Sequence, residues 1–399
     1  MMASKTETFA QQSPTAEDAH SHIVGRDSDV EPVLSVVMPT LNEEEGISVC
    51  IEKVRTAVDE LAVPTEIVVS DSSTDRTPEI AREMGAIVVE PDRAGYGYAY
   101  RYAFERTRGN YVVMGDADTT YDFEQIPRLL DHLEATCADI VMGSRLDGEI
   151  RDGAMPPLHR YIGNPVLTRF LNTFYDAGVS DAHSGFRIFT ADALDTLELE
   201  TTGMEFASEM IMEAGAKDLL IEEVPIVYHE REGEENLESI PDGWRHVRFM
   251  LVNAPSYLFL LPGALLLLVG TLTLGSGALG LSVGGTGLGT TTTIVGALAL
   301  IAGFHVSSLG VFATAAADPI KRPSDPVTNW VIERSSTEQF LAIGAAIVTV
   351  AAGSLFLVTG PGVGAEAVSL TVGSIVVLTA FVIGVQSIFS AFFLRAVSK

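Results

Sequence analysis

Short apolar runs alternate with amphipathic segments between Pro32 and about Ile226. The apolar runs, which predict strands, span residues 34–38, 66–70, 86–90, 111–115 and 140–142. The segments between them predict helices at residues 43–61, 77–84, 98–107 and 126–136. Continuous apolar strands separated by helices are typical of a parallel sheet that is covered on both faces. We therefore expect an α/β domain over residues 32–232.

The C-terminal part of the chain has a different pattern. Four long stretches contain no Asp, Glu, Lys or Arg; they span residues 255–274, 292–317, 340–359 and 369–394. Each is close to the roughly 20 residues that a helix needs to cross a bilayer. Buried helices of a soluble core are the alternative, but the lengths and the lack of charge favour an all-α transmembrane bundle of four helices over residues 255–399.

Two further segments flank these domains. Residues 1–31 are polar, acidic and without periodicity, which predicts a disordered tail and not a signal peptide. Residues 233–254 contain Trp244 with Arg245, His246 and Arg248 close by. An aromatic residue beside basic residues suits the headgroup layer, so this segment is predicted to be an amphipathic interfacial helix.

Charge is unevenly distributed along the chain. The formal net charge is −28, and residues 251–399 contain five basic and five acidic residues, so the excess lies in residues 1–250. That excess excludes non-specific nucleic-acid binding, because polyanions would be repelled. Only five of the 25 basic residues are Lys. An acidic, lysine-poor domain favours a protein of a halophilic archaeon over an acidic mesophile protein.

Basic residues also predict the orientation in the membrane. Arg245 and Arg248 precede the first apolar stretch, and further basic residues lie between the second and third stretches and after the fourth. The other two loops contain none. By the positive-inside rule, the acidic domain and the C-terminus face the cytoplasm, and the protein is a multi-pass protein of the cell membrane.

Polar clusters follow three of the predicted strands, at residues 42–43, 71–75 and 116–118. Ligands of parallel sheets bind at the carboxyl ends of strands, so the clusters predict one site. Asp116 and Asp118 have the oxygen ligands that suit Mg²⁺ or Mn²⁺ bridged to a nucleotide diphosphate, although a solvated turn is the alternative. Asp71 is placed to accept a hydrogen bond from a base, or else to form an N-cap or Asx-turn.

Taken together, these motifs resemble family 2 glycosyltransferases of the branch that makes dolichyl- or polyprenyl-phosphate hexoses. The matching segments span about residues 33–252 and comprise Met38–Glu43, Val69–Thr77, Gly115–Asp118, Gly143–Arg145, Asp181–Arg187, Gly203–Glu209, Glu223–Ile226 and Asp242–His246. The resemblance implies a GT-A fold, the nucleotide-diphospho-sugar transferase fold, with a mostly parallel sheet. It also implies a divalent metal, a nucleotide sugar donor and inverting transfer of a hexose to a lipid phosphate.

The resemblance also assigns roles to residues. It implies that Pro39, Asn42 and Glu43 shape the nucleotide pocket, that Asp116 lies near the ribose or metal, and that Asp118 is the main metal ligand. Asn164 and Ser184 fall in motifs on the acceptor side. The chain departs from the family at Ser70, where an acid is common, at Thr120, where Gln is common, and at residues 233–236, where a Lys is lost.

A phosphate acceptor is already anionic, so it needs cations to position it rather than a general base. Arg binds phosphate bidentately and stays charged. The candidates are Arg145, Arg160, Arg187 and Arg231, with Arg145 and Arg231 favoured as catalytic residues. Structural ion pairs are the alternative in so acidic a domain. Glu205 shares a helix face with Glu209 and is a candidate for contacting sugar hydroxyls or for orienting Arg187.

These observations predict a membrane hexosyltransferase for lipid-linked glycan assembly or protein glycosylation, with UDP-glucose as the first donor and GDP-mannose as the second. A processive polysaccharide synthase is disfavoured, because the chain lacks a Gln-x-x-Arg-Trp motif. A non-catalytic scaffold with this fold and a transporter are further alternatives. The predicted partners are the nucleotide sugar, the lipid phosphate and the bilayer, and the membrane helices could support a homo-oligomer.

Overall fold

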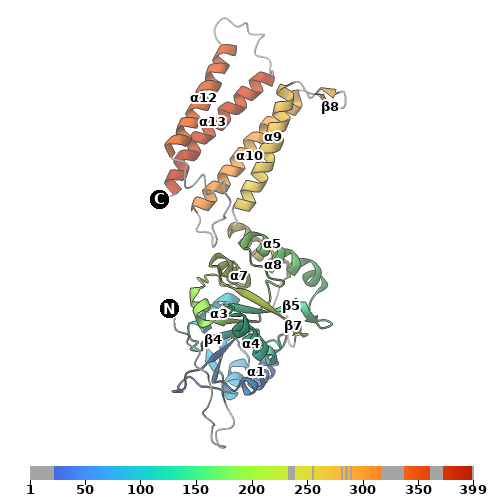
Figure 1. The fold of residues 1–399 in the computed structure, drawn as a ribbon, viewed down its shortest axis with the longest axis vertical. Helices are drawn as coiled ribbons and strands as arrows, with labels where there is room; N and C mark the ends of the chain where they lie inside the picture. The colour runs from blue at the N-terminus through green and yellow to red at the C-terminus, as the bar shows by residue number, and fades with distance from the viewer. Residues whose placement is uncertain are drawn as a thin grey trace, which may run out of the picture. The chain divides into compact units, whose positions relative to one another are not determined.

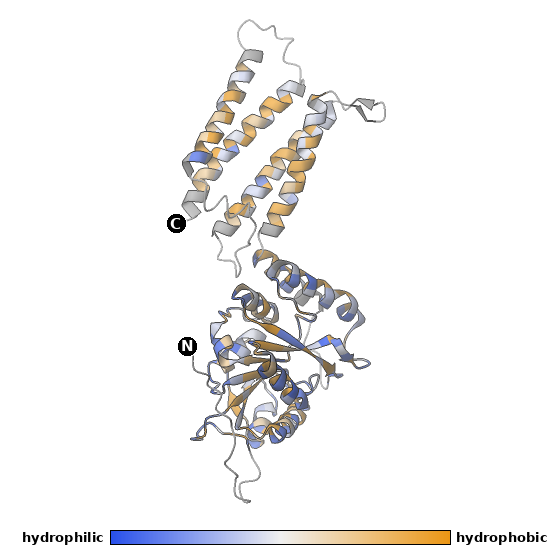
Figure 2. Ribbon diagram, in the orientation of Figure 1, coloured by the Kyte–Doolittle hydropathy of each residue, from blue (hydrophilic) through white to orange (hydrophobic). Residues whose placement is uncertain are grey.

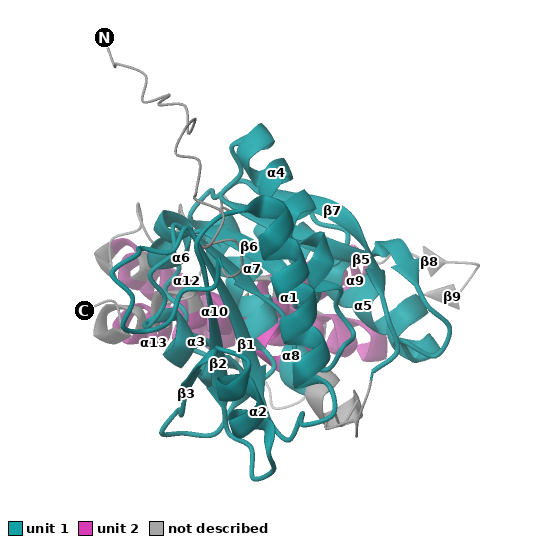
Figure 3. Ribbon diagram, turned by 90° about the horizontal axis from the view of Figure 1, so that it is seen from below, with its two compact units in different colours: residues 1–246 teal, residues 247–399 magenta. Residues whose placement is uncertain are grey.

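A computed structural model describes residues 22–231, 239–253, 256–279, 282–283, 286–287, 290–316, 337–359 and 372–397. The chain divides into two compact units, residues 1–246 and residues 247–399 (Figure 3). Figure 2 shows how they differ in composition: the helices of the second unit are apolar along most of their length, whereas apolar and polar residues are mixed along the first unit.

The first unit is built on a seven-stranded sheet with the order β3-β2-β1-β4-β6-β5-β7 (Figure 1). All neighbouring strands are parallel except β6, which runs antiparallel to both β4 and β5. The predicted mostly parallel sheet is thus confirmed. The strands span Leu34–Thr40 (β1), Thr65–Asp71 (β2), Ile87–Val89 (β3), Tyr111–Met114 (β4), Ile140–Ile150 (β5), Arg187–Thr190 (β6) and Ile221–Tyr228 (β7).

Helices cover both faces of this sheet because the central strands are apolar on both sides. Along β1, Val36 and Met38 face the core that includes α1 and α4. The other face packs against α3, and the aromatic rings of Tyr100 and Phe206 stack there, joining α3 to α7. The helices span Ile47–Leu61 (α1), Thr77–Glu83 (α2), Tyr96–Phe104 (α3), Ile126–Thr136 (α4), Asn164–Tyr175 (α5), Ala191–Thr196 (α6), Phe206–Ala216 (α7) and Ser239–Asn253 (α8).

Three boundaries differ most from the prediction. Helix α1 begins at Ile47 rather than residue 43, since Asn42 has a left-handed backbone (φ 59°) and residues 42–44 bond to the loop after β2. Strand β5 continues to Ile150. Residues 1–21 of the predicted tail lie outside the described residues, but Ile23 forms a parallel bridge with Thr65, so the ordered domain begins before residue 32.

The second unit contains four long helices within its described part: α9 (Leu261–Ala278), α10 (Thr290–Ala316), α12 (Thr337–Thr359) and α13 (Val372–Val397). A short hairpin, β8 (Ser282–Val283) with β9 (Thr286–Gly287), follows α9. Helices α9 and α10 pack closely: a Cβ on Gly270 would lie 2.5 Å from the backbone nitrogen of Leu300. Small residues of this kind permit close helix packing in membranes.

All four predicted apolar stretches therefore form helices. Three of them are long and apolar enough to cross a membrane, over Leu258–Gly277, Thr290–Ala313 and Gly373–Phe393. The described apolar part of α12, Leu341–Ser354, is shorter.

Candidate active site

The carboxyl ends of β1, β2 and β4 bring the three predicted polar clusters to one edge of the sheet. Thr40 of β1 is in register with Asp71 of β2, and Val37 with Met114 of β4. The Asp116–Asp118 loop is held against the start of α1, because a Cβ on Gly46 would lie only 2.9 Å from the carbonyl oxygen of Ala117. The sheet thus fixes the backbone that carries both carboxylates.

Asp118 is the centre of a buried polar cluster. Thr120 donates to its Oδ1 from the backbone nitrogen (3.2 Å) and from the hydroxyl (2.5 Å), and Arg231 Nη1 lies 3.3 Å from its Oδ2. The same guanidinium also donates to Glu43 Oε1. Glu43, Asp118 and Arg231, which were predicted from three separate motifs, are therefore brought together.

The end of β7 positions Arg231. Tyr228 forms an antiparallel bridge with Tyr121, and the backbone nitrogen of His229 donates to the Thr120 carbonyl at 2.9 Å. These contacts tie the chain before Arg231 to the loop after Asp118. Residues 232–238, where the family's Lys is lost, lie outside the described residues.

Glu43 lies in an electrostatically unusual place. Burial is the main cause that raises the pKa of its carboxyl to about 7; Arg231 opposes this shift, while the charges of Asp118 and Asp116 contribute to it. A second cation beside these three acids would relieve the same repulsion.

Asp116 is held by two tyrosines that the sequence analysis did not identify. The hydroxyls of Tyr96 and Tyr100 both donate to Asp116 Oδ1, at 2.8 and 3.1 Å. Burial and the charge of Asp118 raise the pKa of Asp116. The two tyrosines are one helical turn apart on α3, directly after the Gly95 loop, and that spacing was the available sequence signal.

The donor set fits a hard divalent cation. Asp116 and Asp118 offer carboxylate oxygens, and Mg²⁺ characteristically takes one or two carboxylates together with water and substrate phosphates. Among the described residues, no group of three or more His, Cys, Asp or Glu side chains could hold a metal ion. Asp118 forms an ion pair with Arg231, so its carboxylate has a cationic partner in this structure.

Short loops hold the residues that were predicted to bind the nucleotide. Asp71 accepts from the Thr40 hydroxyl at 2.7 Å and from the backbone nitrogen of Ser73 at 3.3 Å, an Asx-type arrangement. Asn42 Oδ1 accepts from the backbone nitrogen of Thr74 at 2.8 Å. Pro39 lies in β1, opposite Ser70 of β2. These residues lie together at the carboxyl edge of the sheet, where Asp71 and Asn42 bond to neighbouring loops; their binding of a nucleotide stays a prediction.

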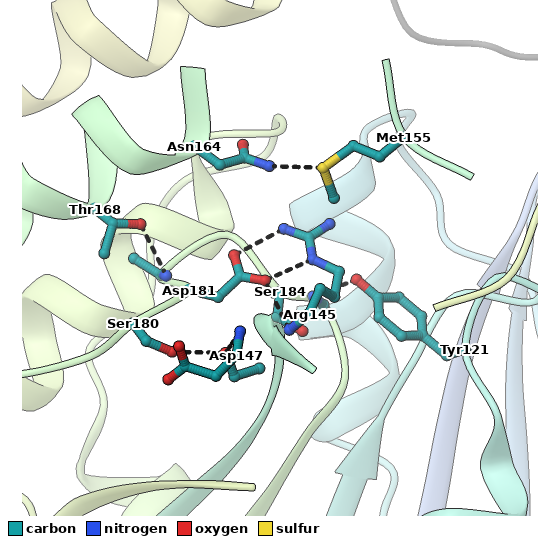
Figure 4. Close-up of polar contacts among 12 residues, drawn as sticks. Tyr121, Arg145, Asp147, Met155, Asn164, Thr168, Ser180, Asp181 and Ser184 are labelled. Atoms are coloured by element: carbon teal, nitrogen blue, oxygen red, sulfur yellow. Dashed lines mark hydrogen bonds and ion pairs between the residues drawn. The ribbon is translucent and has the colours of Figure 1, made fainter. Parts of the chain in front are cut away.

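Arg145 forms a buried bidentate pair with Asp181 (Figure 4). Its Nε and Nη2 lie 2.7 and 2.9 Å from the two carboxylate oxygens, and its backbone nitrogen donates to the same group. This pairing holds the pKa of Asp181 below its usual value despite burial.

Two other residues predicted for the acceptor side make contacts close to their own positions in the sequence. Asn164, at the start of α5, donates to the sulfur of Met155, and Arg160 lies over the ring of Tyr161.

The remaining predicted acceptor residues are placed differently. Arg187 is fully buried, and its guanidinium donates to the carbonyls of Ser184, Ala182 and Ala207. Those bonds hold the 182–187 loop, so the structure does not bring Arg187 to a surface where a phosphate could bind. Ser184 is also fully buried. Glu205 precedes α7, while Glu209 accepts from residues 200 and 201 and does not orient Arg187.

Comparison with known proteins identifies two matching regions. Residues 35–198 match glycosyl transferase family 2, and residues 311–398 match the glycosyltransferase family 2 C-terminal transmembrane region. The chain is 54% identical over 391 residues to the low-salt glycan biosynthesis hexosyltransferase Agl6 of Haloferax volcanii, covering 96% of this chain and 95% of that protein.

Two further proteins are similar to part of the chain. A dolichyl-phosphate hexose transferase of Haloferax volcanii is 38% identical over 53% of this chain and 89% of its own length. A crystal structure of glucosyl-3-phosphoglycerate synthase from Mycobacterium tuberculosis, in complex with Mn²⁺, UDP-glucose and glycerol 3-phosphate, is 22% identical, with a TM-score of 0.44 over 61% of this chain and 86% of that chain.

Proposed function

The chain belongs to glycosyl transferase family 2, and we propose that it transfers a hexose from a nucleotide sugar to dolichyl or polyprenyl phosphate with inversion at the anomeric carbon. The observation that carries this proposal is the cluster of Glu43, Asp116, Asp118 and Arg231 at the carboxyl edge of the sheet. The chain also continues into apolar helices that are long enough to cross a membrane, which would keep the enzyme at the bilayer where a lipid-linked acceptor lies.

The geometry of the loops supports a donor site at this edge of the sheet. Asp71 and Asn42 would border the base, and Asp116 and Asp118 would hold Mg²⁺ or Mn²⁺. Such an ion, when bound, stabilises the negative charge of the leaving diphosphate. Tyr96 and Tyr100 keep Asp116 fixed, while Thr120 fixes Asp118, so the carboxylates are aimed before the donor arrives.

The acceptor phosphate reacts without a general base. One of its oxygens attacks the anomeric carbon as the bond from that carbon to the diphosphate oxygen breaks, and no proton must be removed. Arg231 is the cation best placed to hold this phosphate, because it is part-exposed and already lies beside Asp118. Arg145 would act on the same side through its pairing with Asp181, which fixes the loop whose Ala182 backbone nitrogen donates to Thr168 of α5.

The relatives and the composition support a choice of substrates. Haloarchaeal relatives and a strongly acidic domain support dolichyl phosphate as the acceptor and lipid-linked glycan assembly as the role. UDP-glucose is the first donor to test and GDP-mannose the second. The distribution of basic residues supports a cytoplasmic catalytic unit and C-terminus.

A transfer assay tests this proposal. Membranes containing the full chain are incubated in high salt with Mg²⁺ or Mn²⁺, dolichyl phosphate and either UDP-glucose or GDP-mannose labelled in the sugar. We expect one donor to give a labelled lipid together with the free nucleoside diphosphate. Absence of a labelled lipid with every hexose donor tried, from protein that still binds nucleotide, would contradict the proposed reaction.

A further inference from the structure

Tyr121 lies between the residues of the proposed donor side and those of the proposed acceptor side. It follows the Asp116–Asp118 loop by three residues and is only 2% exposed. Its hydroxyl accepts a hydrogen bond from the backbone nitrogen of Gly185 at 2.7 Å. Gly185 belongs to residues 181–187, which we call the 181–187 loop. Figure 4 shows the Tyr121 hydroxyl pointing toward this loop beside Arg145.

The 181–187 loop also approaches the Asp116 carboxylate closely. A Cβ on Gly185 would lie 3.1 Å from Asp116 Oδ2 and 3.3 Å from the hydroxyl oxygen of Tyr121. The other carboxylate oxygen, Oδ1, is the one to which Tyr96 and Tyr100 donate. Residue 185 therefore borders the carboxylate oxygen that those two tyrosines do not hold, and a shift of the loop would change the surroundings of that oxygen.

Aromatic packing connects Tyr121 to the arginine of the acceptor side. Its ring stacks on Phe186, with 5.7 Å between the ring centres and 20° between the planes, and lies edge-on to Tyr228 at 5.3 Å. The guanidinium carbon of Arg145 lies 5.2 Å from the centre of the Tyr228 ring, which is within the range of a cation–π interaction. Asp181, at the start of the 181–187 loop, holds the same guanidinium. Tyr121 thus packs against both the loop and the ring that contacts Arg145.

The proposed reaction makes the relative position of the two sides important. Asp116 and Asp118 would hold the donor through its diphosphate, whereas the acceptor phosphate would lie on the side of Arg145. Bond formation requires the attacking oxygen and the anomeric carbon to lie about 3–3.5 Å apart and in line, and a misplacement of about 1 Å can cost about a hundredfold in rate. A buried contact between the 181–187 loop and Asp116 is therefore placed to control the rate of transfer.

We propose that Tyr121 is a positioning residue that holds the 181–187 loop, and with it Arg145, in register with the Asp116 carboxylate. The acceptor phosphate then meets the anomeric carbon of a donor that is already in place. This inference rests on the proposed function and deepens it, because it assigns the alignment of the two substrates to a residue that none of the predicted polar clusters contains.

Hydrogen exchange of the full chain, measured by mass spectrometry, tests this coupling without turnover. Mn²⁺ together with UDP, or together with GDP, serves as the donor-side ligand, and exchange is followed in peptides that cover the 181–187 loop. We expect the ligand to slow exchange of this loop in the wild type, because Gly185 borders Asp116. In Tyr121→Phe the Gly185 amide loses its acceptor, so we expect faster exchange that the ligand no longer slows.

Tyr111→Phe is the matched control, since the Tyr111 hydroxyl donates to Glu134 outside the site. Its 181–187 loop should respond to the ligand as the wild type does. The same response in Tyr121→Phe, or a wild-type loop that does not respond although residues 116–118 are protected, would overturn the inference alone. Absence of protection at residues 116–118 with either nucleotide would contradict the proposed function, and the inference with it.

A kinetic measurement separates positioning from a purely structural role. In the transfer assay, Tyr121→Phe should lower kcat for transfer about tenfold and change the KM for the nucleotide sugar less than about twofold. Hydrolysis of the donor, in which water attacks the anomeric carbon and releases free hexose, does not use the acceptor side. We therefore expect hydrolysis to fall less than transfer, so that the ratio of free hexose to labelled lipid rises.

Gly185→Ala disturbs the same contact from the other side, because its Cβ would press on Asp116 Oδ2 and on the Tyr121 hydroxyl. It should raise the same ratio, and it keeps the test decisive if Tyr121→Phe does not fold. Gly25→Ala is its control, since a Cβ there meets no atom within 4 Å. A ratio of hydrolysis to transfer that stays at the wild-type value in the folded variants would overturn the inference. A wild type that transfers no hexose would instead contradict the proposed function.

Discussion

At the scale of residues, the ion pair between Arg145 and Asp181 is expected to contribute to the stability of the fold. The pair is buried, with side-chain exposures of 0% and 9%, and removing one member of such a pair leaves an uncompensated charge. Asp181→Asn should therefore lower the free energy of unfolding by about 3–5 kcal/mol, measured as a loss of thermal stability of the solubilised protein. The matched control is Arg82→Ala, which breaks the exposed pair with Glu90 and should cost less than about 1 kcal/mol. Equal losses in the two variants would contradict the structural importance of the buried pair.

His183 makes stability depend on pH. Burial, together with the charge of His246, lowers its pKa from 6.5 to about 3, and Asp181, Arg145 and Arg187 also lie close enough to act on it. Between these values the unfolded chain binds a proton that the folded chain does not. The free energy of unfolding should therefore fall as the pH falls from 6.5 towards 3, by up to about 1.4 kcal/mol per pH unit. His183→Asn should flatten this part of the melting profile, and an unaltered slope would contradict the assignment.

Some residues could be identified from the sequence because their chemistry is local. Asp116 and Asp118 are two positions apart at a strand end, so their pairing is visible in the sequence. The partner of Arg145 lies 36 residues away, and only the fold shows that Asp181 engages its guanidinium. The same holds for Arg187. Its guanidinium donates to backbone carbonyls, and every residue has one, so the side chains in the sequence do not indicate these partners.

At the scale of elements, α3 is the support of the Asp116 carboxylate. Tyr96→Phe removes a hydroxyl that donates to it, and a hydrogen bond to a charged group is worth about 1.5–3 kcal/mol. We expect the half-saturating concentration of Mg²⁺ or Mn²⁺, or of the nucleotide sugar, to rise about tenfold. Tyr98→Phe is the matched control on the same helix, because Tyr98 donates to the exposed Asp92 instead, and it should change these constants less than about twofold. Equal effects of the two variants would contradict a specific role for α3.

Elements with a continuous apolar pattern could be predicted, and those without one could not. The strands β1, β2 and β4 are buried along most of their length, which gives the apolar runs that marked them. Strand β6 has four residues, begins with Arg187 and runs antiparallel to β4. It is too short to give an apolar run that would mark it as a strand in the sequence. The start of α1 was misplaced because residues 43–46 look like a first turn, whereas their backbone bonds to the neighbouring loop.

On the scale of the whole molecule, the orientation in the membrane is testable with a native residue. Cys137 is exposed on the first unit, while Cys50 is buried. If the catalytic unit is cytoplasmic, a membrane-impermeant maleimide should label Cys137 only after the cells are lysed. Cys137→Ser should abolish that labelling, and labelling of intact cells would reverse the predicted topology.

The two-part organisation was the most predictable property of the chain. Apolar stretches of bilayer length are self-evident in a sequence, and all four form helices. Their pairing through small residues depends on contacts such as that of Gly270 with Leu300, which hydropathy does not encode. The exposure of Leu158, Ile162 and Val166, at the start of helix α5 and just before it, likewise depends on the fold and is not encoded by hydropathy.

The measurement that decides most is hexose transfer by an Asp118→Asn variant of the full chain in membranes. The change keeps the shape of the side chain but removes its charge, and loss of metal-assisted stabilisation worth several kcal/mol should lower the rate of lipid labelling at least about a hundredfold. The matched control is Asp122→Asn in the same loop, whose carboxylate pairs with Lys53 and should be dispensable. Near-normal transfer by folded Asp118→Asn protein would contradict a metal-dependent transferase centred on this carboxylate.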